Sequence, residues 1–325
     1  MKHMHRSFRA RFFPSSGYPV PLLTAGEITQ LSWSKLLPTI EDAPEMYRAS
    51  LETLAWRAQT HPTMIFIPTF GNFRRSDQGK ILCSLDERIY LLESEKNTVT
   101  TTCYPIEDIN YFDLGMVLLQ GWIKLRGMTE EGQSAFFTVV FNRVNLILFH
   151  PILLQIRRAS GEPGGRASEA ELQKFDHLID RNYKLMNYAR ASLLPEDCVM
   201  YSVLQPDIRR RMLSLFGKSY YQTLAHAHLF ILTDRELILI RDENLVKWRA
   251  DLRYGGIWSY FPREKVTSLS LSKSAEESLV LSIHLPHDDR IDLLYSPERG
   301  DELDQLLGLF ESSRSAAPRP AGIWN

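Results

Sequence analysis

The sequence predicts an α+β protein built from two copies of one small β-domain, each closed by a C-terminal helix. Three observations predict this fold class. The stretch LDERIYLLESE at 85–95 returns in similar form as TDRELILIRDE at 233–243. An aromatic–proline pair follows in each copy, as YPIEDI at 104–109 and FPREKV at 261–266. Both copies then end in an apolar helix pattern, and repetition in the same order over this length indicates a duplicated domain.

The composition suits two folded domains and carries no global charge signal. Of the 325 residues 44% are hydrophobic, and the formal net charge is −1. A chain of this length and apolar content can bury two cores of ordinary size. Because the net charge is so small, any electrostatic function must come from a local patch, and no nucleic acid partner is expected.

Residues 1–61 are expected to form an N-terminal arm followed by a helix. The first 26 residues contain no acid, and Pro14, Pro19 and Pro21 disfavour a long helix there. From Pro44 to residue 60, apolar residues recur at helical spacing, which predicts a helix that opens with its proline.

The first β-domain is predicted at 62–158. Seven stretches rich in β-branched and aromatic residues are separated by turn residues, which is the pattern of antiparallel strands. The stretches are TMIFIPTF, KILCSL, RIYLLES, TVTTTCYP, INYFDL, VLLQGWIKLRG and AFFTVVF. An apolar segment then predicts a buried closing helix with a kink or a start at Pro151.

A linker and a helix are predicted at 159–195. Small and polar residues, with three glycines, make ASGEPGGRAS at 159–168 the clearest linker in the chain. Ser168 and Glu171 have the spacing of a capping box, which predicts that one helix runs from this point to Pro195.

The second β-domain is predicted at 196–313, and a disordered tail at 314–325. Its strand-like stretches follow the order of the first domain, and Pro297 is expected to open the closing helix. One segment differs, since DIRRRMLSLFG at 207–217 is interpreted as a short helix after the first strand.

At these motifs the sequence resembles the pleckstrin-homology-like (PH-like) superfold, particularly its bacterial PH-like and GRAM-like groups. The carriers are SLDERIYLL, LTDRELILI, YPIEDI and FPREKV, and the resemblance covers 62–158 and 196–313. The order of strands and helix predicts two bent sandwiches or partly open barrels, each capped by its last helix. Asp86 and Asp234 are expected in equivalent tight turns, and Pro105 and Pro262 at equivalent strand starts.

The candidate binding residues form two basic clusters, each between the first and second strands of its copy. The resemblance implies that lipid-binding members of the superfold dock anionic head groups in this interval. Neither cluster has the spaced Lys/Arg pattern of the phosphoinositide-binding members, so solvated charge on a helix is the alternative. The clusters are Arg74, Arg75 and Lys80 in the first copy and Arg209, Arg210, Arg211 and Lys218 in the second.

A metal site is a weaker candidate. His226 and His228 alternate with alanine and would project from one face of a strand, where His284 or His287 could join them. No carboxylate or cysteine is spaced locally to complete the ligands, so neither a metal nor a cofactor is expected. The sequence also has no signature of nucleophilic catalysis, paired catalytic carboxylates or a nucleotide-binding loop, so an enzyme is not expected.

We therefore expect a non-catalytic scaffold protein that recognises a protein or peptide partner through tandem PH-like domains. One alternative is a peripheral membrane protein that binds anionic lipid through the basic clusters. Another is an unrecognised metal-dependent or hydrolytic enzyme. Cys83, Cys103 and Cys198 lie in apolar, strand-like stretches, which indicates a reducing compartment. Since no apolar run approaches the ~20 residues that span a bilayer, a cytoplasmic location with optional peripheral membrane association is expected.

Overall fold

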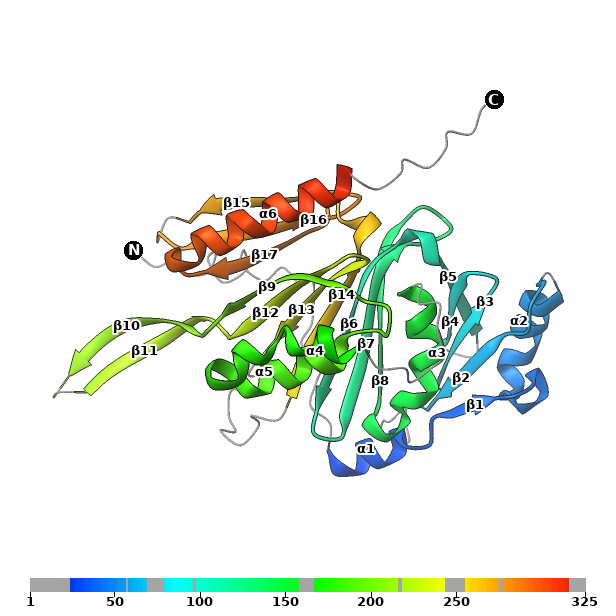
Figure 1. Cartoon of the computed structure of the whole chain (residues 1–325). Helices are drawn as coiled ribbons and strands as arrows, with labels where there is room; N and C mark the ends of the chain where they lie inside the picture. Colours follow the sequence, from blue (N-terminus) through cyan, green and yellow to red (C-terminus); the bar gives the residue numbers. More distant parts are fainter. Residues whose placement is uncertain are drawn as a thin grey trace, which may run out of the picture. The chain divides into compact units, whose positions relative to one another are not determined.

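The computed structural model describes residues 24–56, 58–68, 79–95, 98–157, 167–215, 218–242, 255–274 and 277–315 (Figure 1). The predicted class is confirmed at the level of an α+β protein with mostly antiparallel sheets and few helices. Among the described residues no sheet closes into a barrel. These residues form two compact units, while the residue limits predicted for the domains stay a prediction.

The first unit, called the β1–β8 unit, consists of residues 24–157 and 255–259. Its larger sheet has the strand order β1-β2-β3-β4-β5, and β6, β7 and β8 pair in sequence order. The strands are β1 (Lys35–Leu37), β2 (Thr63–Ile67), β3 (Lys80–Leu85), β4 (Arg88–Glu95), β5 (Thr98–Pro105), β6 (Ile109–Val117), β7 (Gln120–Met128) and β8 (Ser134–Asn142). The helices are α1 (Ala25–Leu31), α2 (Glu45–Trp56) and α3 (Leu146–Ile156), with short 3-10 helices η1 (Ile40–Asp42), η2 (Ile106–Asp108) and η3 (Arg143–Asn145).

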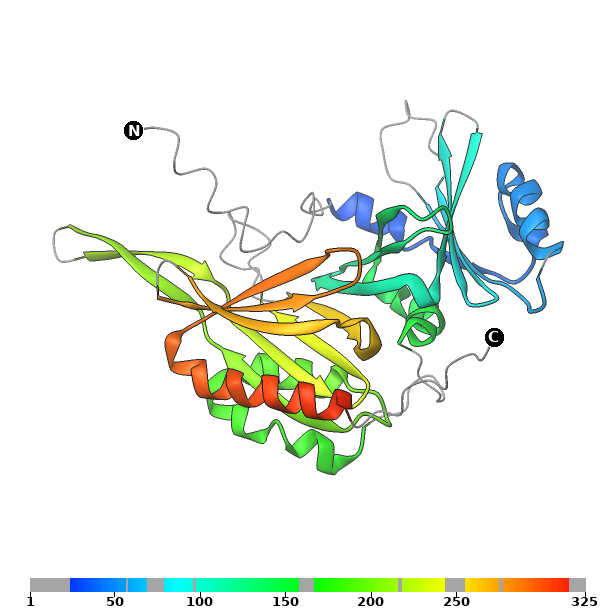
Figure 2. The ribbon, with the colours of Figure 1, turned by 90° about the horizontal axis from the view of Figure 1, so that it is seen from above.

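Helices cover both faces of the larger sheet. On one face, Tyr47 and Leu51 of α2 are buried in a cluster with Ile81 and Cys83 of β3. Figure 2 shows α2 on one side of the sheet and α3 on the other, where α3 contacts β2. The helix predicted after Pro44 is confirmed as α2, although it ends at Trp56.

A strand from late in the sequence belongs partly to this unit. β14 (Gly255–Pro262) lies next to β6 in the sheet, and its residues up to Ser259 group with the β1–β8 unit. Ile257 packs with Val117 and Trp122, and the Ser259 hydroxyl donates to the buried Asp113 carboxylate. The sequence did not predict that the start of β14 would join the β1–β8 unit, because a strand pattern does not show which sheet the strand belongs to.

The second unit, called the β9–β17 unit, consists of residues 167–242 and 260–315. β12 pairs with both β9 and β13, while β10 and β11 form a separate hairpin and β16 pairs with both β15 and β17. The strands are β9 (Val199–Gln205), β10 (Ile208–Leu215), β11 (Lys218–Ala225), β12 (His228–Thr233), β13 (Glu236–Arg241), β15 (Ser268–Lys273), β16 (Leu279–His284) and β17 (Arg290–Tyr295). The helices are α4 (Glu169–Gln173), α5 (Ile179–Ser192) and α6 (Gly300–Ser315), with η4 (Asp176–Leu178), η5 (Arg263–Lys265) and η6 (Pro297–Arg299).

The sheet of β9, β12 and β13 is covered on both faces. α5 contacts β12 and β13, and α6 contacts β9 and β15. In Figure 1, α5 lies below this sheet and α6 with β15–β17 lies above it. All residues of β12 and β13 are buried, which explains why these strands are nearly continuous apolar runs in the sequence.

The two halves of the chain have the same order of elements. The series α2, β2–β5, η2, β6–β8, η3, α3 corresponds to α5, β9, β12–β14, η5, β15–β17, η6, α6, with β10–β11 inserted after β9. In both series the last helix contacts the first strand, as α3 with β2 and α6 with β9.

The repeated sequence phrases mark an equivalent hydrogen-bonded turn. Asp86 lies between β3 and β4, and its carboxylate accepts the N–H groups of Gln59 and Thr60 at 2.8 and 3.1 Å. Asp234 lies between β12 and β13 and accepts the Cys198 N–H at 2.9 Å. Each aspartate therefore holds the chain just before the first strand of its copy, so the predicted equivalence of position is confirmed, although only the first turn has positive φ, at Asp86 (48°) and Glu87 (59°).

A matching backbone bond joins each turn to the aromatic–proline motif. The N–H of Ile106 donates to Glu87 O, and that of Arg263 donates to Arg235 O, both at 2.9 Å. These donors follow Pro105 and Pro262, which are the last residues of β5 and β14. The prediction that the prolines begin strands is wrong, since proline has no N–H to continue the ladder and each is followed by a 3-10 turn.

The prediction of one continuous helix after Ser168 is also wrong. It is divided into α4, η4 and α5, and Asn182 inside α5 has non-helical angles (φ −161°, ψ 84°). The predicted linker lies outside the described residues except for its last two positions. α3 starts at Leu146 and contains Pro151, so the proline does not mark the helix start.

Candidate functional site

The structure describes the second basic cluster more fully than the first. Arg74 and Arg75 lie outside the described residues. Lys80 opens β3, and its ammonium forms an ion pair with Glu93 of β4. The described part of the first cluster is thus paired with a neighbouring strand.

Arg209, Arg210 and Arg211 lie in β10, and Lys218 opens β11. The interpretation of 207–217 as a helix is therefore wrong. Arginine, methionine and leucine favour a helix locally, but pairing with β11, which contains Tyr220, decides for a strand. All three arginines are exposed, so the alternative of solvated charge on a helix no longer applies.

The hairpin has a mixed cationic and amphipathic surface. Arg209 pairs with Thr223 and Arg211 with Tyr221 across the two strands, so each pair shares a face of the ribbon. A bulge between Arg211 and Leu213 leaves Met212 without an opposite residue. The exposed fractions are 55% for Met212, 56% for Tyr220 and 61% for Tyr221. Large side chains at this exposure are candidates for contact with a partner.

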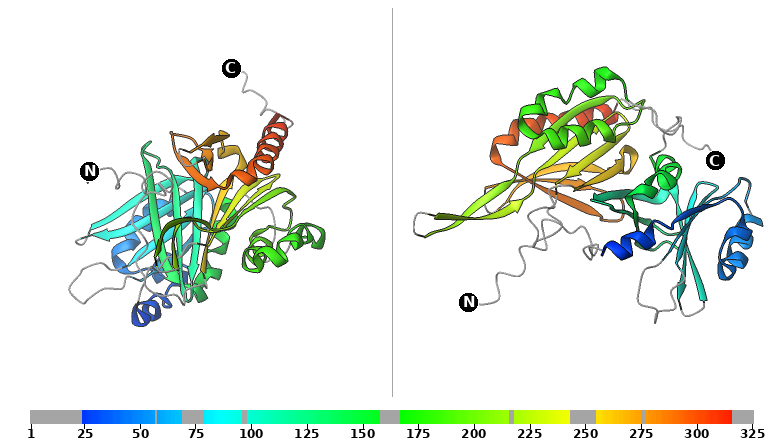
Figure 3. Two further views of the ribbon diagram at one scale, coloured as in Figure 1. Left: turned by 90° about the vertical axis from the view of Figure 1, so that its left-hand side faces the viewer. Right: turned by 90° about the horizontal axis from the view of Figure 1, so that it is seen from below.

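The hairpin projects from the rest of its unit. Both Figure 1 and the right-hand view of Figure 3 show β10 and β11 extending well beyond the ends of β9 and β12. In the sequence from 207 to 225 there are four cations and one acid, Asp207, so the local net charge is 4 − 1 = +3. A positive ribbon is thus presented by a chain whose net charge is −1.

Asp207 fixes the root of the hairpin. Its carboxylate accepts the Ala227 N–H at 2.9 Å and the Arg209 guanidinium at 2.6 Å, and lies 4.0 Å from His226 Nδ1. Burial opposes ionisation of Asp207, yet the hydrogen bonds from Arg209 and Ala227 hold its pKa below the ordinary value. Asp207 therefore joins the residue before β10 to the chain after β11, at the base of the hairpin.

The two histidines that were the weaker candidate for a metal site lie in different settings. His226 lies in the connection before β12 and is partly exposed, whereas His228 begins β12 and is buried, so the prediction of one shared strand face is wrong. His228 Nδ1 is 2.9 Å from His226 O and donates to it. In the described part of the chain, no group of three or more His, Cys, Asp or Glu side chains is placed to hold a metal.

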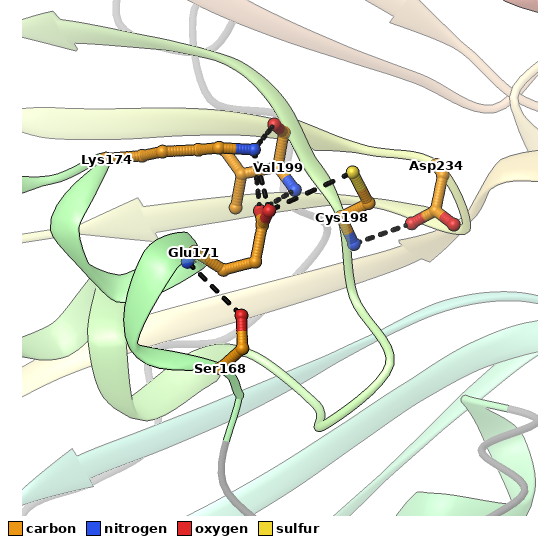
Figure 4. A network of polar contacts seen from close by, with 6 residues as sticks. All are labelled: Ser168, Glu171, Lys174, Cys198, Val199 and Asp234. Atoms are coloured by element: carbon orange, nitrogen blue, oxygen red, sulfur yellow. Dashed lines mark hydrogen bonds and ion pairs between the residues drawn. The ribbon is translucent and has the colours of Figure 1, made fainter.

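A second polar network, unforeseen from the sequence, surrounds Cys198 (Figure 4). Glu171 accepts the Val199 N–H at 2.6 Å and the Lys174 ammonium at 2.8 Å, and Lys174 also donates to Val199 O. Ser168 accepts the Glu171 N–H, but the Glu171 carboxylate binds β9, so only half of the expected capping box forms. The network fastens α4 to the start of β9.

The cysteines divide into two kinds. Cys83 and Cys103 are buried in β3 and β5, as small hydrophobic side chains. Cys198 is exposed, which corrects the expectation of apolar surroundings for all three. Its Sγ lies 4.0 Å from a Glu171 oxygen, and the same carboxylate accepts the Lys174 ammonium.

The exposed residues Met212, Tyr220 and Tyr221 were missed as functional candidates. The available signal was the density of large residues beside cations in RRRMLSLFGKSYY, which the helix interpretation obscured. In comparisons with known proteins, no family model matches this chain, and no curated protein matches its sequence.

Proposed function

We propose that this protein is a non-catalytic, peripheral membrane-docking protein that contacts anionic lipid through the β10–β11 hairpin. The observation that carries the proposal is a projecting ribbon with three exposed arginines, an exposed methionine and two exposed tyrosines. Cations attract anionic head groups, and tyrosine is enriched at the membrane–water interface. Transfer of the methionine side chain from water into the bilayer is favourable in free energy.

The strength of this contact follows from the charges. Each basic residue near an anionic leaflet contributes on the order of 1 kcal/mol, and Asp207 offsets part of the Arg209 charge. The hairpin alone then supplies about 2–3 kcal/mol of electrostatic attraction, which is weak and sensitive to salt. Entry of Met212 and the tyrosines into the interface would add a part that salt does not screen.

The fold supports a binding role. Each half has strands followed by a closing helix, which is the order that the PH-like resemblance implies, and β10–β11 lies between the first and second strands of the second half. That interval is where lipid-binding members of the superfold are expected to hold head groups. A protein or peptide partner was the leading expectation from the sequence, and the membrane role is proposed instead because the exposed arginines beside Met212 and the tyrosines combine charge with amphipathic side chains.

No described helix has the length and apolar character needed to cross a membrane. Attachment by a surface hairpin needs no such helix.

The test is charge reversal on the hairpin. The variant R209E/R210E/R211E is expected to lose at least about ten-fold in binding to vesicles containing phosphatidylserine at ~0.1 M salt, because attraction becomes repulsion. Co-sedimentation measures the bound fraction. The matched control R181E/K265E/K273E makes the same change in net charge on other cations of the same unit and should bind like wild type.

Three outcomes would contradict the proposal. Wild type could ignore anionic vesicles at low salt, the hairpin variant could bind as wild type does, or the control could lose as much as the hairpin variant. A further variant, R209K/R210K/R211K, keeps the charge and should keep vesicle binding. Its failure would indicate recognition that needs the guanidinium fork, as on a phosphorylated protein or a nucleic acid.

A further inference from the structure

A second exposed apolar surface lies in the β1–β8 unit. Val117 pairs with Gln120, so Leu118 and Leu119 form the two-residue connection of the β6–β7 hairpin. The Arg143 N–H donates to Leu119 O at 2.7 Å, which places η3 and the start of α3 beside this connection. The Leu118 patch consists of Leu118, Leu119, Val144 and Ile147, which are 52%, 54%, 64% and 63% exposed.

Leu118 has a backbone conformation that leucine rarely adopts. Its φ is +53°, in the region where two-residue hairpins normally use glycine or asparagine. A bulky, exposed side chain at this position is unfavourable for folding and gains nothing from burial in the unit. Strain of this kind is typically retained where a side chain has a function outside the fold.

The end of α1 joins the surroundings of the patch. Asn142 Nδ2 donates to Ile28 O and Asn145 Nδ2 to Leu31 O, each at 3.1 Å. Trp33, two residues after α1, is 65% exposed. Exposed tryptophan is typical of side chains at the level of lipid head groups.

Basic residues accompany the segments that form the patch. Residues 117–120 and 142–157 contain no aspartate or glutamate and include Arg143, next to Val144, and Arg157, at the end of α3, while α1 carries Glu27 in its first turn. Arg143 itself is exposed between the leucine pair and Val144. An exposed apolar connection with an exposed arginine beside it complements a membrane surface.

We infer that the Leu118 patch is a second membrane contact, in which Leu118 and Leu119 enter the interface of the bilayer. Its partner is the same as in the proposed function, but it lies in the other unit and acts through apolar insertion. The contribution of the Leu118 patch to membrane binding should therefore persist at high salt and on vesicles of uncharged lipid. Under these conditions the β10–β11 hairpin contributes little to binding.

The test uses uncharged vesicles of phosphatidylcholine at ~0.5 M salt, where electrostatic attraction is largely screened. Wild type is expected to partition measurably, and L118S/L119S to lose about ten-fold or more. The matched variant I179S/Y183S removes two exposed apolar side chains from α5, 46% and 64% exposed, and should partition as wild type does. R209E/R210E/R211E should also retain its partitioning under these conditions, so failure of the hairpin proposal and failure of this one are distinguishable.

Leu118→Gly provides a second variant that should fold at least as well as wild type. Glycine accepts the positive φ, so the melting temperature should be unchanged or higher, while partitioning falls. Absence of wild-type partitioning into uncharged vesicles, or equal partitioning of wild type and L118S/L119S, would overturn the inference. Capture of a protein partner that L118S/L119S loses, without vesicle binding, would assign the patch to a protein instead.

Discussion

Replacing Gly127 with alanine is expected to destabilise the β1–β8 unit by about 3 kcal/mol. Gly127 of β7 lies against the chain that enters β6. An added Cβ would stand 2.5 Å from Asp108 O and 2.9 Å from the Ile109 Cα. Both neighbours are backbone atoms, so no side chain can rotate away, and the strands must separate or the hydrogen-bonded register must shift.

The control for this prediction is Gly26→Ala in α1 of the same unit. A Cβ there meets nothing within 4 Å, and alanine is favoured over glycine in a helix by about 1 kcal/mol. Unfolding in urea, followed by circular dichroism, compares the midpoints of the two variants with wild type. A Gly127→Ala midpoint equal to that of wild type would show that the close approach of β7 to Asp108 is not as described.

The second large effect is loss of stability in acid, caused by His228. The side chain is fully buried, and burial lowers its pKa to about 4, with the hydrogen bond to His226 O opposing the shift and Arg241 adding to it. Above the unfolded pKa of 6.5 both states are neutral and His228 has no effect. As pH falls from 6.5 to 4, only the unfolded chain takes up the proton, and about 3 kcal/mol of unfolding free energy is lost.

His228→Asn keeps a donor at the Nδ1 position but does not titrate. Its unfolding free energy is expected to fall by about 3 kcal/mol less than that of wild type between pH 7 and pH 4, whatever its stability at pH 7. His287→Asn makes the same substitution at an exposed turn and should follow wild type at both pH values. Equal acid losses in wild type and His228→Asn would contradict a neutral, buried His228.

The repeated order of elements could be predicted because its markers are local. Asp86 and Asp234 each bind backbone N–H groups through a turn, and Pro105 and Pro262 each end a strand before a 3-10 helix. Short-range requirements of this kind leave the same residues at the same spacing in both halves. The sequence therefore predicted the order of elements well.

Features decided by distant residues could not be predicted in this way. The strand conformation of Arg209–Arg211 depends on pairing with β11, and the place of Gly255–Ser259 depends on β6. The binding of Glu171 to Val199 likewise joins residues 28 positions apart and replaces half of a local capping motif. Leu118 and Leu119 gave no signal, because neither leucine is typical of a two-residue turn.

The central claim is that the β10–β11 hairpin touches an anionic bilayer, and a fluorophore at position 212 tests it most directly. Cys198→Ser removes the exposed thiol, while Cys83 and Cys103 are buried, which raises the pKa of each thiol to about 12 and leaves them slow to label. In that background, Met212→Cys carries an environment-sensitive dye, and Gly308→Cys on α6 carries the same dye in open space.

Emission is recorded as vesicles containing phosphatidylserine are added at ~0.1 M salt, at which charges are screened beyond about 10 Å. The account predicts a blue shift for the dye at 212, little change for the dye at 308, and reversal of the shift when salt is raised. An unchanged spectrum at 212 while the protein sediments with the vesicles, or an equal shift at 212 and 308, would contradict the claim.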